Sequence, residues 1–188
     1  MRYLVLFLCI GSIAFQILAG KLHFVAPQGF NRRTILTSLC FVCAATANLV
    51  VLSHSQISLV RSSIAVGLYL GSLALLASAI KTNRDRPLSV AFTPDEPKHH
   101  VTKGPYRFIR HPFYAAYCIT WLAGALASWS VLLSMIGALM VILYWRAARF
   151  EEKKFENSSM APSYALYRSQ AGMFWPLPVT ILRYLKAK

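Results

Sequence analysis

The chain has few charged residues and very few acids. Charged residues make up 14% of its 188 positions, and only 6 are Asp or Glu, against 20 Lys and Arg. Hydrophobic residues reach 56%. Because soluble domains carry about 25% charged residues, this composition excludes an ordinary soluble domain and predicts a polytopic membrane protein.

Glycine-rich signatures of soluble nucleotide-binding domains are also absent. The chain contains no G-x-G-x-x-G pattern, no phosphate-loop pattern and no internal repeat. Its polar stretches are too short for a doubly wound nucleotide-binding domain. Any cofactor must therefore be bound by loops and helix ends of a membrane domain.

Cysteines are few, and all four lie inside apolar stretches: Cys9, Cys40, Cys43 and Cys118. This pattern excludes a secreted disulfide framework. Cys40-x-x-Cys43 has the spacing of half a zinc site, but no second ligand pair accompanies it. The adjacent His99 and His100 also lack fixed partners. We expect packing cysteines and no metal site.

Apolar stretches predict an all-α fold with about five transmembrane helices. Residues 2–19, 34–53 and 57–80 each approach the ~20 residues that a spanning helix needs. Residues 113–145 are too long for one span and are interrupted at 128–130, which predicts a hairpin of two helices of about 16 residues each. The first stretch could also be a cleaved signal peptide, but we expect it to be retained.

Basic residues predict the orientation in the membrane. With five spans, all Lys and Arg except Arg2 and Arg61 fall on one side, together with all six acids. The positive-inside rule then puts the amino terminus outside and the other face in the cytosol, at a bacterial inner membrane or an endomembrane. The basic residues at helix ends would contact lipid headgroups, so we expect no nucleic-acid partner.

Residues 104–114, GPYRFIRHPFY, place ionisable side chains just before the fourth span. Gly104-Pro105 predicts a turn and Pro112 a helix start. The side chains left at the membrane interface are Tyr106, Arg107, Arg110 and His111. The free N–H groups at a helix amino terminus and the guanidinium of an arginine can together bind a carboxylate or a phosphate. Lipid anchoring would explain Arg107, but it needs no His beside a fixed Pro.

Glu151 and Glu152 follow two arginines on an expected helical extension of the fifth span. One of these acids can face inward while the other is solvated. Surface ion pairs along the helix are the alternative. Tyr164 and Tyr167 share a helix face and could close over a ligand or rest on lipid headgroups.

Together these elements resemble the integral membrane methyltransferases that include isoprenylcysteine carboxyl methyltransferases and phospholipid N-methyltransferases. That family carries G-P-Y-R-x-x-R-H-P-x-Y, then a hairpin, an E-E pair and Y-x-x-Y, matched here by residues 104–114, Glu151-Glu152, Tyr164 and Tyr167. The resemblance covers about the carboxyl-terminal half. It implies S-adenosyl-L-methionine bound in a pocket open to the cytosol and a lipophilic methyl acceptor that arrives through the membrane.

The resemblance also implies roles for individual residues. The implied cofactor-binding residues are Gly104, Tyr106, Arg110, His111, Pro112, Tyr114, Glu151, Glu152, Tyr164 and Tyr167. Arg110, His111 and Glu152 are the expected catalytic residues. Arg110 and His111 would hold the cofactor's carboxylate or order the loop, while either Glu would take its ammonium or ribose hydroxyls. The rings of Tyr106 and Tyr114 would line the pocket around the adenine or the sulfonium.

The predicted layout is a single membrane domain, residues 1–188. Three spans fill residues 1–80, and a cytosolic loop with the cofactor motif fills 81–112. The hairpin fills 113–146, and a cytosolic tail with interfacial helices, 147–188, would cap the cofactor.

The chain departs from the family pattern in the tail. Many members have Phe-Gly before Y-x-x-Y where this chain has Met160-Ala161, and an arginine is missing from residues 172–176. If that arginine holds a substrate carboxylate, another lipid or a hydrophobic small molecule is favoured over prenylcysteine. An insertion at residues 85–100 would shape access.

Two other functions stay open. Membrane sterol reductases that use NADPH share an R-H-P-x-Y-like signature, but they usually continue with Gly and an acid where this chain has Ala115-Ala116. A transporter or assembly protein would need polar residues in series within several spans, and only Gln16, Asn48 and Arg61 stand out. The Glu pair favours methyl transfer.

Overall fold

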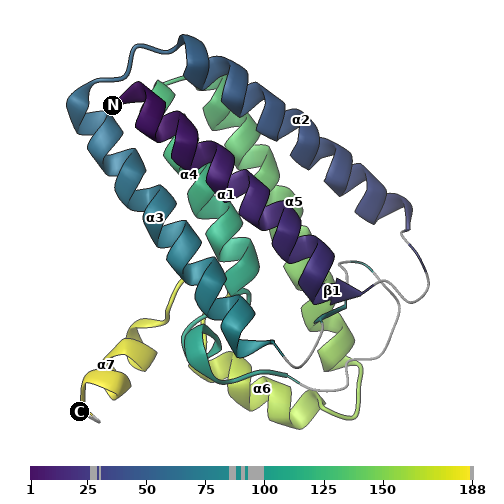
Figure 1. Cartoon of the computed structure of the whole chain (residues 1–188). Helices are drawn as coiled ribbons and strands as arrows, with labels where there is room; N and C mark the ends of the chain where they lie inside the picture. The colour runs from purple at the N-terminus through teal and green to yellow at the C-terminus, as the bar shows by residue number, and fades with distance from the viewer. Residues whose placement is uncertain (26–28, 30, 85–87, 90–91, 93–99, 187–188) are drawn as a thin grey trace.

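The computed structural model describes the chain apart from residues 26–28, 30, 85–87, 90–91, 93–99 and 187–188 (Figure 1). The described part is almost entirely helical, as predicted. Its helices are α1 (Arg2–His23), α2 (Arg32–His54), α3 (Leu59–Thr82), the 3-10 helix η1 (Gly104–Arg107), α4 (Pro112–Ser128), α5 (Val131–Glu156), α6 (Ala161–Gln170) and α7 (Pro178–Lys186). Two short strands, β1 (Phe24–Val25) and β2 (Leu88–Ser89), pair in parallel.

Four of the described helices, α1, α2, α3 and α5, are long and apolar enough to cross a membrane. The predicted all-α polytopic membrane fold is therefore confirmed. α4 is shorter, with 17 residues. It lies in the middle of the bundle, where it contacts all four of the longer helices, and it stays the predicted fifth span.

The hairpin between α4 and α5 forms where the apolar run is interrupted. α4 ends at Ser128, Trp129 adopts a left-handed conformation with φ 54°, and the Ser130 hydroxyl caps α5 by accepting from the Leu133 amide. α5 then runs for 26 residues, which covers the predicted span of about 16 residues and the predicted helical extension beyond it. It is longer because helical hydrogen bonding continues beyond the apolar part, which ends at Trp145, into a charged extension.

Polar residues inside the bundle are used for packing between helices. Gln16 donates to the Thr120 hydroxyl over 2.8 Å, and Ser72 donates to the Ala116 carbonyl over 2.7 Å. Arg61 donates to the Ala127 carbonyl at the end of α4. Such contacts join membrane helices in place of a hydrophobic driving force.

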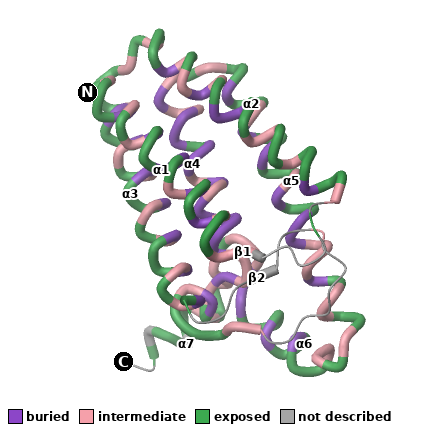
Figure 2. Tube along the Cα trace, turned by 45° about the vertical axis from the view of Figure 1, so that its right-hand side comes forward, coloured by how far each residue is buried: buried purple, intermediate pink, exposed green. Residues whose placement is uncertain are grey.

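The loops that precede the site gather at one end of the bundle. β1 follows α1 and pairs with β2, which follows α3, so both strands lie at the same end of the bundle as α6 (Figure 1). Buried residues concentrate on α4 and the inward sides of its neighbours (Figure 2). Large apolar side chains on the outer sides of α1, α2 and α3 are exposed, as expected for helices in contact with lipid.

The contact between α2 and α4 gives a stability prediction. A Cβ at Gly124 would lie 1.9 Å from Oδ1 of the buried Asn48, whereas one at Gly137 would meet nothing closer than 3.6 Å. We expect Gly124→Ala to lower the free energy of unfolding by about 1–3 kcal/mol. The control Gly137→Ala should change it by less than about 1 kcal/mol, because Ala also favours the helix. Thermal unfolding in detergent measures both, and equal behaviour of the two variants would contradict the close approach of α2 and α4.

Candidate functional site

The segment before α4 is joined to the tail through backbone hydrogen bonds. The Arg110 amide donates to the Gly172 carbonyl over 2.7 Å, and the His111 amide donates to the Met173 carbonyl over 3.1 Å. A Cβ at Gly172 would lie 1.7 Å from the Trp175 carbonyl oxygen, so this close approach requires glycine. The tail segment (residues 171–173) therefore lies directly against the start of α4.

Glu152 is the centre of the site. Its side chain is 0% exposed, and Oε1 lies 2.8 Å from both Nε and Nη2 of Arg110. His111 Nε2 lies 3.3 Å from the same oxygen, and Arg149 Nη1 donates to Oε2 over 3.0 Å. Buried carboxylates are found in proteins only with such partners, so this constellation must form as a unit.

Arg110 connects three elements of the structure. Besides its contacts with Glu152, its Nη1 donates to the Ala171 carbonyl and, over 3.3 Å, to the Arg168 carbonyl at the end of α6. Its side chain is 8% exposed. Because all three guanidinium nitrogens already donate within the protein, Arg110 fixes α5, α6 and the tail segment relative to the start of α4.

Glu151 has a different environment from its neighbour. Its side chain is 25% exposed, and Oε2 lies 3.5 Å from His111 Nδ1. Tyr114 donates its hydroxyl to Glu151 Oε1 over 2.5 Å. The Tyr114 ring stacks on the His111 imidazole with 5.8 Å between centroids. The structure thus separates the two acids: Glu152 is buried in ion pairs, and Glu151 reaches the surface beside aromatic rings.

The two acids also determine the charge of His111. Burial alone lowers its pKa, but hydrogen bonds to Glu151 and Glu152 raise the pKa above its ordinary value of 6.5. Burial raises the pKa of Glu152, but the hydrogen bond from His111 and the charge of Arg110 outweigh it and lower that pKa to about 2. Both groups lie outside the spanning segments, Glu152 on the charged extension of α5. The two carboxylates therefore favour the imidazolium form of His111.

The other predicted tyrosines lie in packing contacts beside this cluster. Tyr106 on η1 accepts a hydrogen bond from Asn83 over 2.5 Å, and Tyr167 donates to the Tyr106 carbonyl over 2.8 Å. Tyr164 stacks on Phe155 with 4.5 Å between centroids. These contacts fix η1 and α6 in place. Gly104 opens η1 with a φ of 56°, a conformation that favours glycine.

Sequence reasoning missed two aromatic residues beside the site. Tyr144 on α5 stacks on Tyr114 with 5.6 Å between centroids. Phe174 in the tail meets the edge of the His111 ring at 6.3 Å. One signal was present for Tyr144, which precedes Glu151 by two helical turns and so shares its face of α5. No local pattern marks Phe174.

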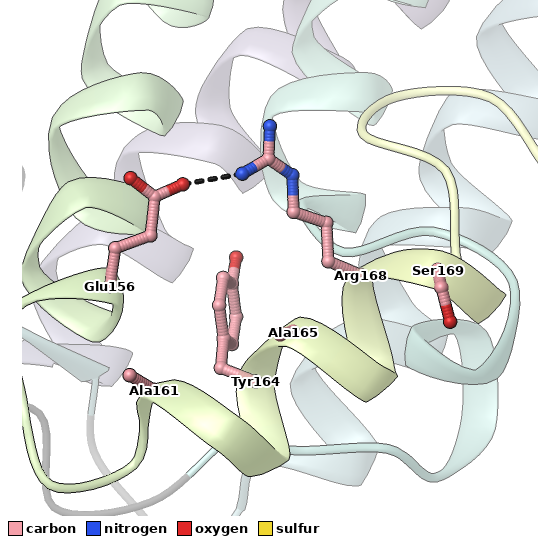
Figure 3. Close-up of a pocket in the computed structure, with 6 residues that line it drawn as sticks. All are labelled: Glu156, Ala161, Tyr164, Ala165, Arg168 and Ser169. Atoms are coloured by element: carbon pink, nitrogen blue, oxygen red, sulfur yellow. Dashed lines mark hydrogen bonds and ion pairs between the residues drawn. The ribbon is translucent and has the colours of Figure 1, made fainter.

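A shallow, open hollow of about 540 Å³ lies beside α6 (Figure 3). Its lining residues are Glu156, Ala161, Tyr164, Ala165, Arg168 and Ser169. Arg168 donates to Glu156 beside the Tyr164 ring. Arg110 and Glu151 do not line this hollow, so it is separate from the buried charges. The charged residues that line the hollow form one exposed ion pair, whereas the cluster around Glu152 is buried.

The predictions for the insertion fall partly outside the described residues, including Asp85, the acids at 95 and 96, and His99. His100 is described, and its ring stacks on Tyr167 with 5.3 Å between centroids. Within the described residues, no group of three or more His, Cys, Asp or Glu could hold a metal ion.

The structure thus defines a polytopic helical membrane protein with a buried charged cluster at one end of its bundle. The sequence profile of the phospholipid methyltransferase family matches residues 60–161, more than half of the chain. The chain belongs to this family, as the sequence resemblance predicted, and methyl transfer to lipid-type substrates is the activity that the family indicates. Searches of curated proteins and of solved structures find no match. The matched residues include the motif before α4 and the Glu pair, and they end at the start of α6.

Two Glu→Gln substitutions compare a buried ion pair with an exposed one. Glu152→Gln leaves Arg110 buried without a counter-charge, so we expect a loss of about 3–5 kcal/mol in the free energy of unfolding. Glu156→Gln removes the partner of the exposed Arg168, and it should cost no more than about 1 kcal/mol. Thermal or denaturant unfolding in detergent measures both, and similar losses would contradict the central place of Glu152.

The shifted pKa values predict how stability depends on pH. The pKa of His111 is raised, so its stabilisation is full below pH 6.5, its ordinary pKa, and is lost as the pH rises through the folded-state value. The pKa of Glu152 is lowered, so its stabilisation is full above pH 4.5 and is lost as the pH falls toward 2. The unfolding temperature should therefore be highest between these limits.

His111→Gln tests the alkaline side of this profile. The variant should lose the decline above pH 6.5 that we assign to His111 and show a smaller decline at acid pH, because His111 also lowers the pKa of Glu152. An unchanged alkaline decline would show that another group causes it.

Proposed function

We propose that the protein transfers a methyl group from S-adenosyl-L-methionine to a lipophilic acceptor in the membrane. One observation carries this proposal: Glu151 is partly exposed beside His111 and Tyr114, on a frame fixed by the fully buried Glu152. Membership of a methyltransferase family supports it. A charged cluster of this kind is also more than helix packing in a membrane requires.

The residues around Glu151 suit the chemical groups of this cofactor. Glu151 can accept from its ammonium or ribose hydroxyls, and Arg149, whose side chain is 40% exposed, can hold its carboxylate. The rings of His111, Tyr114 and Phe174 meet at 5.8 to 6.5 Å between centroids. Among them, the uncharged Tyr114 and Phe174 rings can attract adenine or a sulfonium.

Arg110 and Glu152 take a positioning role in this proposal. Glu152 is fully buried and Arg110 donates from every guanidinium nitrogen, so both side chains already hold the frame together. Together they hold His111, Glu151 and the tail segment at fixed places. Such preorganisation accounts for much of the rate in a displacement that requires alignment and a water-poor site.

The bound cofactor would supply an electrophilic methyl group on its sulfonium. An amine acceptor must lose its proton before it can attack. The two carboxylates raise the pKa of His111 and so favour its protonated form, which cannot accept another proton. We therefore assign acceptance of the proton to the Glu151 carboxylate, with Tyr114 orienting it through the hydrogen bond to Oε1.

A lipid amine suits this site better than a lipid carboxylate. A carboxylate acceptor needs a cation to position it. In the described site, Arg110 already contacts Glu152 and backbone carbonyls, and His111 already contacts the two acids. The tail also lacks the arginine expected in residues 172–176. An amine instead finds Glu151 and aromatic faces.

The proposed arrangement in the membrane follows the charges. The connections after α1 and α3 lie at the end of the bundle that holds α6, and this end carries most of the Lys and Arg residues. We assign it to the cytosol and the amino terminus to the opposite side, within a single domain of residues 1–188.

Calorimetric titration of the detergent-purified protein with S-adenosylhomocysteine and, separately, with NADPH tests the cofactor. We expect only the first to bind. Binding of NADPH alone would establish a reductase instead, and binding of neither would contradict an enzyme that uses either cofactor.

Glu151→Gln tests the site with the same titration. Loss of a charged hydrogen-bond partner should weaken S-adenosylhomocysteine binding about tenfold or more. Glu156→Gln, in the hollow beside α6, is the matched control and should bind as the unmodified protein does. Equal affinity of all three proteins would remove Glu151 from the cofactor site.

A further inference from the structure

α7 turns its polar side toward its own protein. Thr180 donates its hydroxyl to the Gln170 carbonyl at the end of α6. The Tyr184 ring meets the edge of Phe108 at 5.3 Å, and the Arg107 guanidinium lies 5.8 Å from its centroid. Thr180 and Tyr184 are four residues apart, so they lie on one side of the helix. That side packs on residues 107 and 108, in the motif before α4, and on the end of α6.

The apolar side of α7 points away from the protein. Leu182 is 58% exposed, and Val179 and Ile181 are exposed as well. Trp175, just before the helix, is 63% exposed. A surface helix of a soluble protein does the reverse, with its apolar stripe on the core. The apolar side chains on this outward face are therefore expected to contact an apolar environment that the chain itself does not provide.

The bilayer of the same protein fits this face. α7 lies at the end of the bundle that holds α6 (Figure 1), where helices that span the membrane end. With 9 residues it is too short to cross. Its sequence contains Arg183 and Lys186 and no acid, and a Trp beside an amphipathic helix is typical of the membrane interface. Two copies packed through this helix would bring together two basic segments with no acid in either.

We propose that α7 and Trp175 form a surface anchor that inserts its apolar side into the bilayer interface and binds anionic lipid headgroups. Each basic residue near an anionic surface strengthens binding about fivefold, so two of them give about 25-fold. Along the chain, the anchor comes directly after the tail segment. The backbone carbonyls of that segment accept hydrogen bonds from the Arg110 and His111 amides. Docking on lipid therefore holds that segment against the start of α4. The family match ends at residue 161, before this helix begins.

Lipid-depth quenching on the full-length protein tests the anchor. Leu182→Cys carries an environment-sensitive fluorophore, and the protein is placed as single copies in nanodiscs of phosphatidylcholine, with or without about 30% phosphatidylglycerol. Doxyl-labelled lipid quenches a probe that lies in the interface. Asn157→Cys, at the end of α5, is the matched control. The four native cysteines lie within α1, α2 and α4, and labelling of the unmodified protein measures their background.

We expect lipid to quench the probe at position 182, several-fold more strongly with phosphatidylglycerol present, and to leave the probe at 157 unquenched. No quenching in either disc would overturn the anchor, and quenching without dependence on phosphatidylglycerol would overturn anionic recognition. A probe that is shielded from aqueous iodide only in discs with two copies would assign this face to a second copy instead. None of these outcomes depends on methyl transfer.

Discussion

The buried carboxylate of Glu152 is the interaction on which the arrangement of this protein's site depends. An isolated buried charge costs several kcal/mol, and here two arginines and His111 compensate it. Arg110 in turn donates to carbonyls at the end of α6 and in the tail segment. One carboxylate therefore fixes the relative positions of α4, α5, α6 and the tail.

The contacts around Glu152 give two adjacent acids different roles, one structural and one chemical. Glu152 faces inward and forms ion pairs, whereas Glu151, the residue before it on the same helix, reaches the surface beside Tyr114. α4 contributes to both, because its buried central position fixes the direction of the residues at its first turn. A short, rigid helix surrounded by longer ones suits a site that must stay aligned with a substrate in the membrane.

The sequence alone predicted the features that depend on local pattern. Apolar runs located the spanning helices, the interruption at residues 128–130 located the hairpin, and the motif resemblance identified the family. Local pattern could not decide which Glu is buried, because that depends on how α5 is rotated against α4. The backbone pairing of Arg110 with Gly172 and the orientation of α7 join distant parts of the chain, so no spacing rule indicated them.

Methyl transfer to a lipid amine at Glu151 is tested most directly by following a labelled methyl group. The protein is reconstituted in vesicles with or without phosphatidylethanolamine and supplied with S-adenosylmethionine labelled on its methyl group. The account predicts base-stable label in the lipid fraction only when the amine lipid is present. Base-labile label, the behaviour of a methyl ester, or no label in lipid at all, would contradict it.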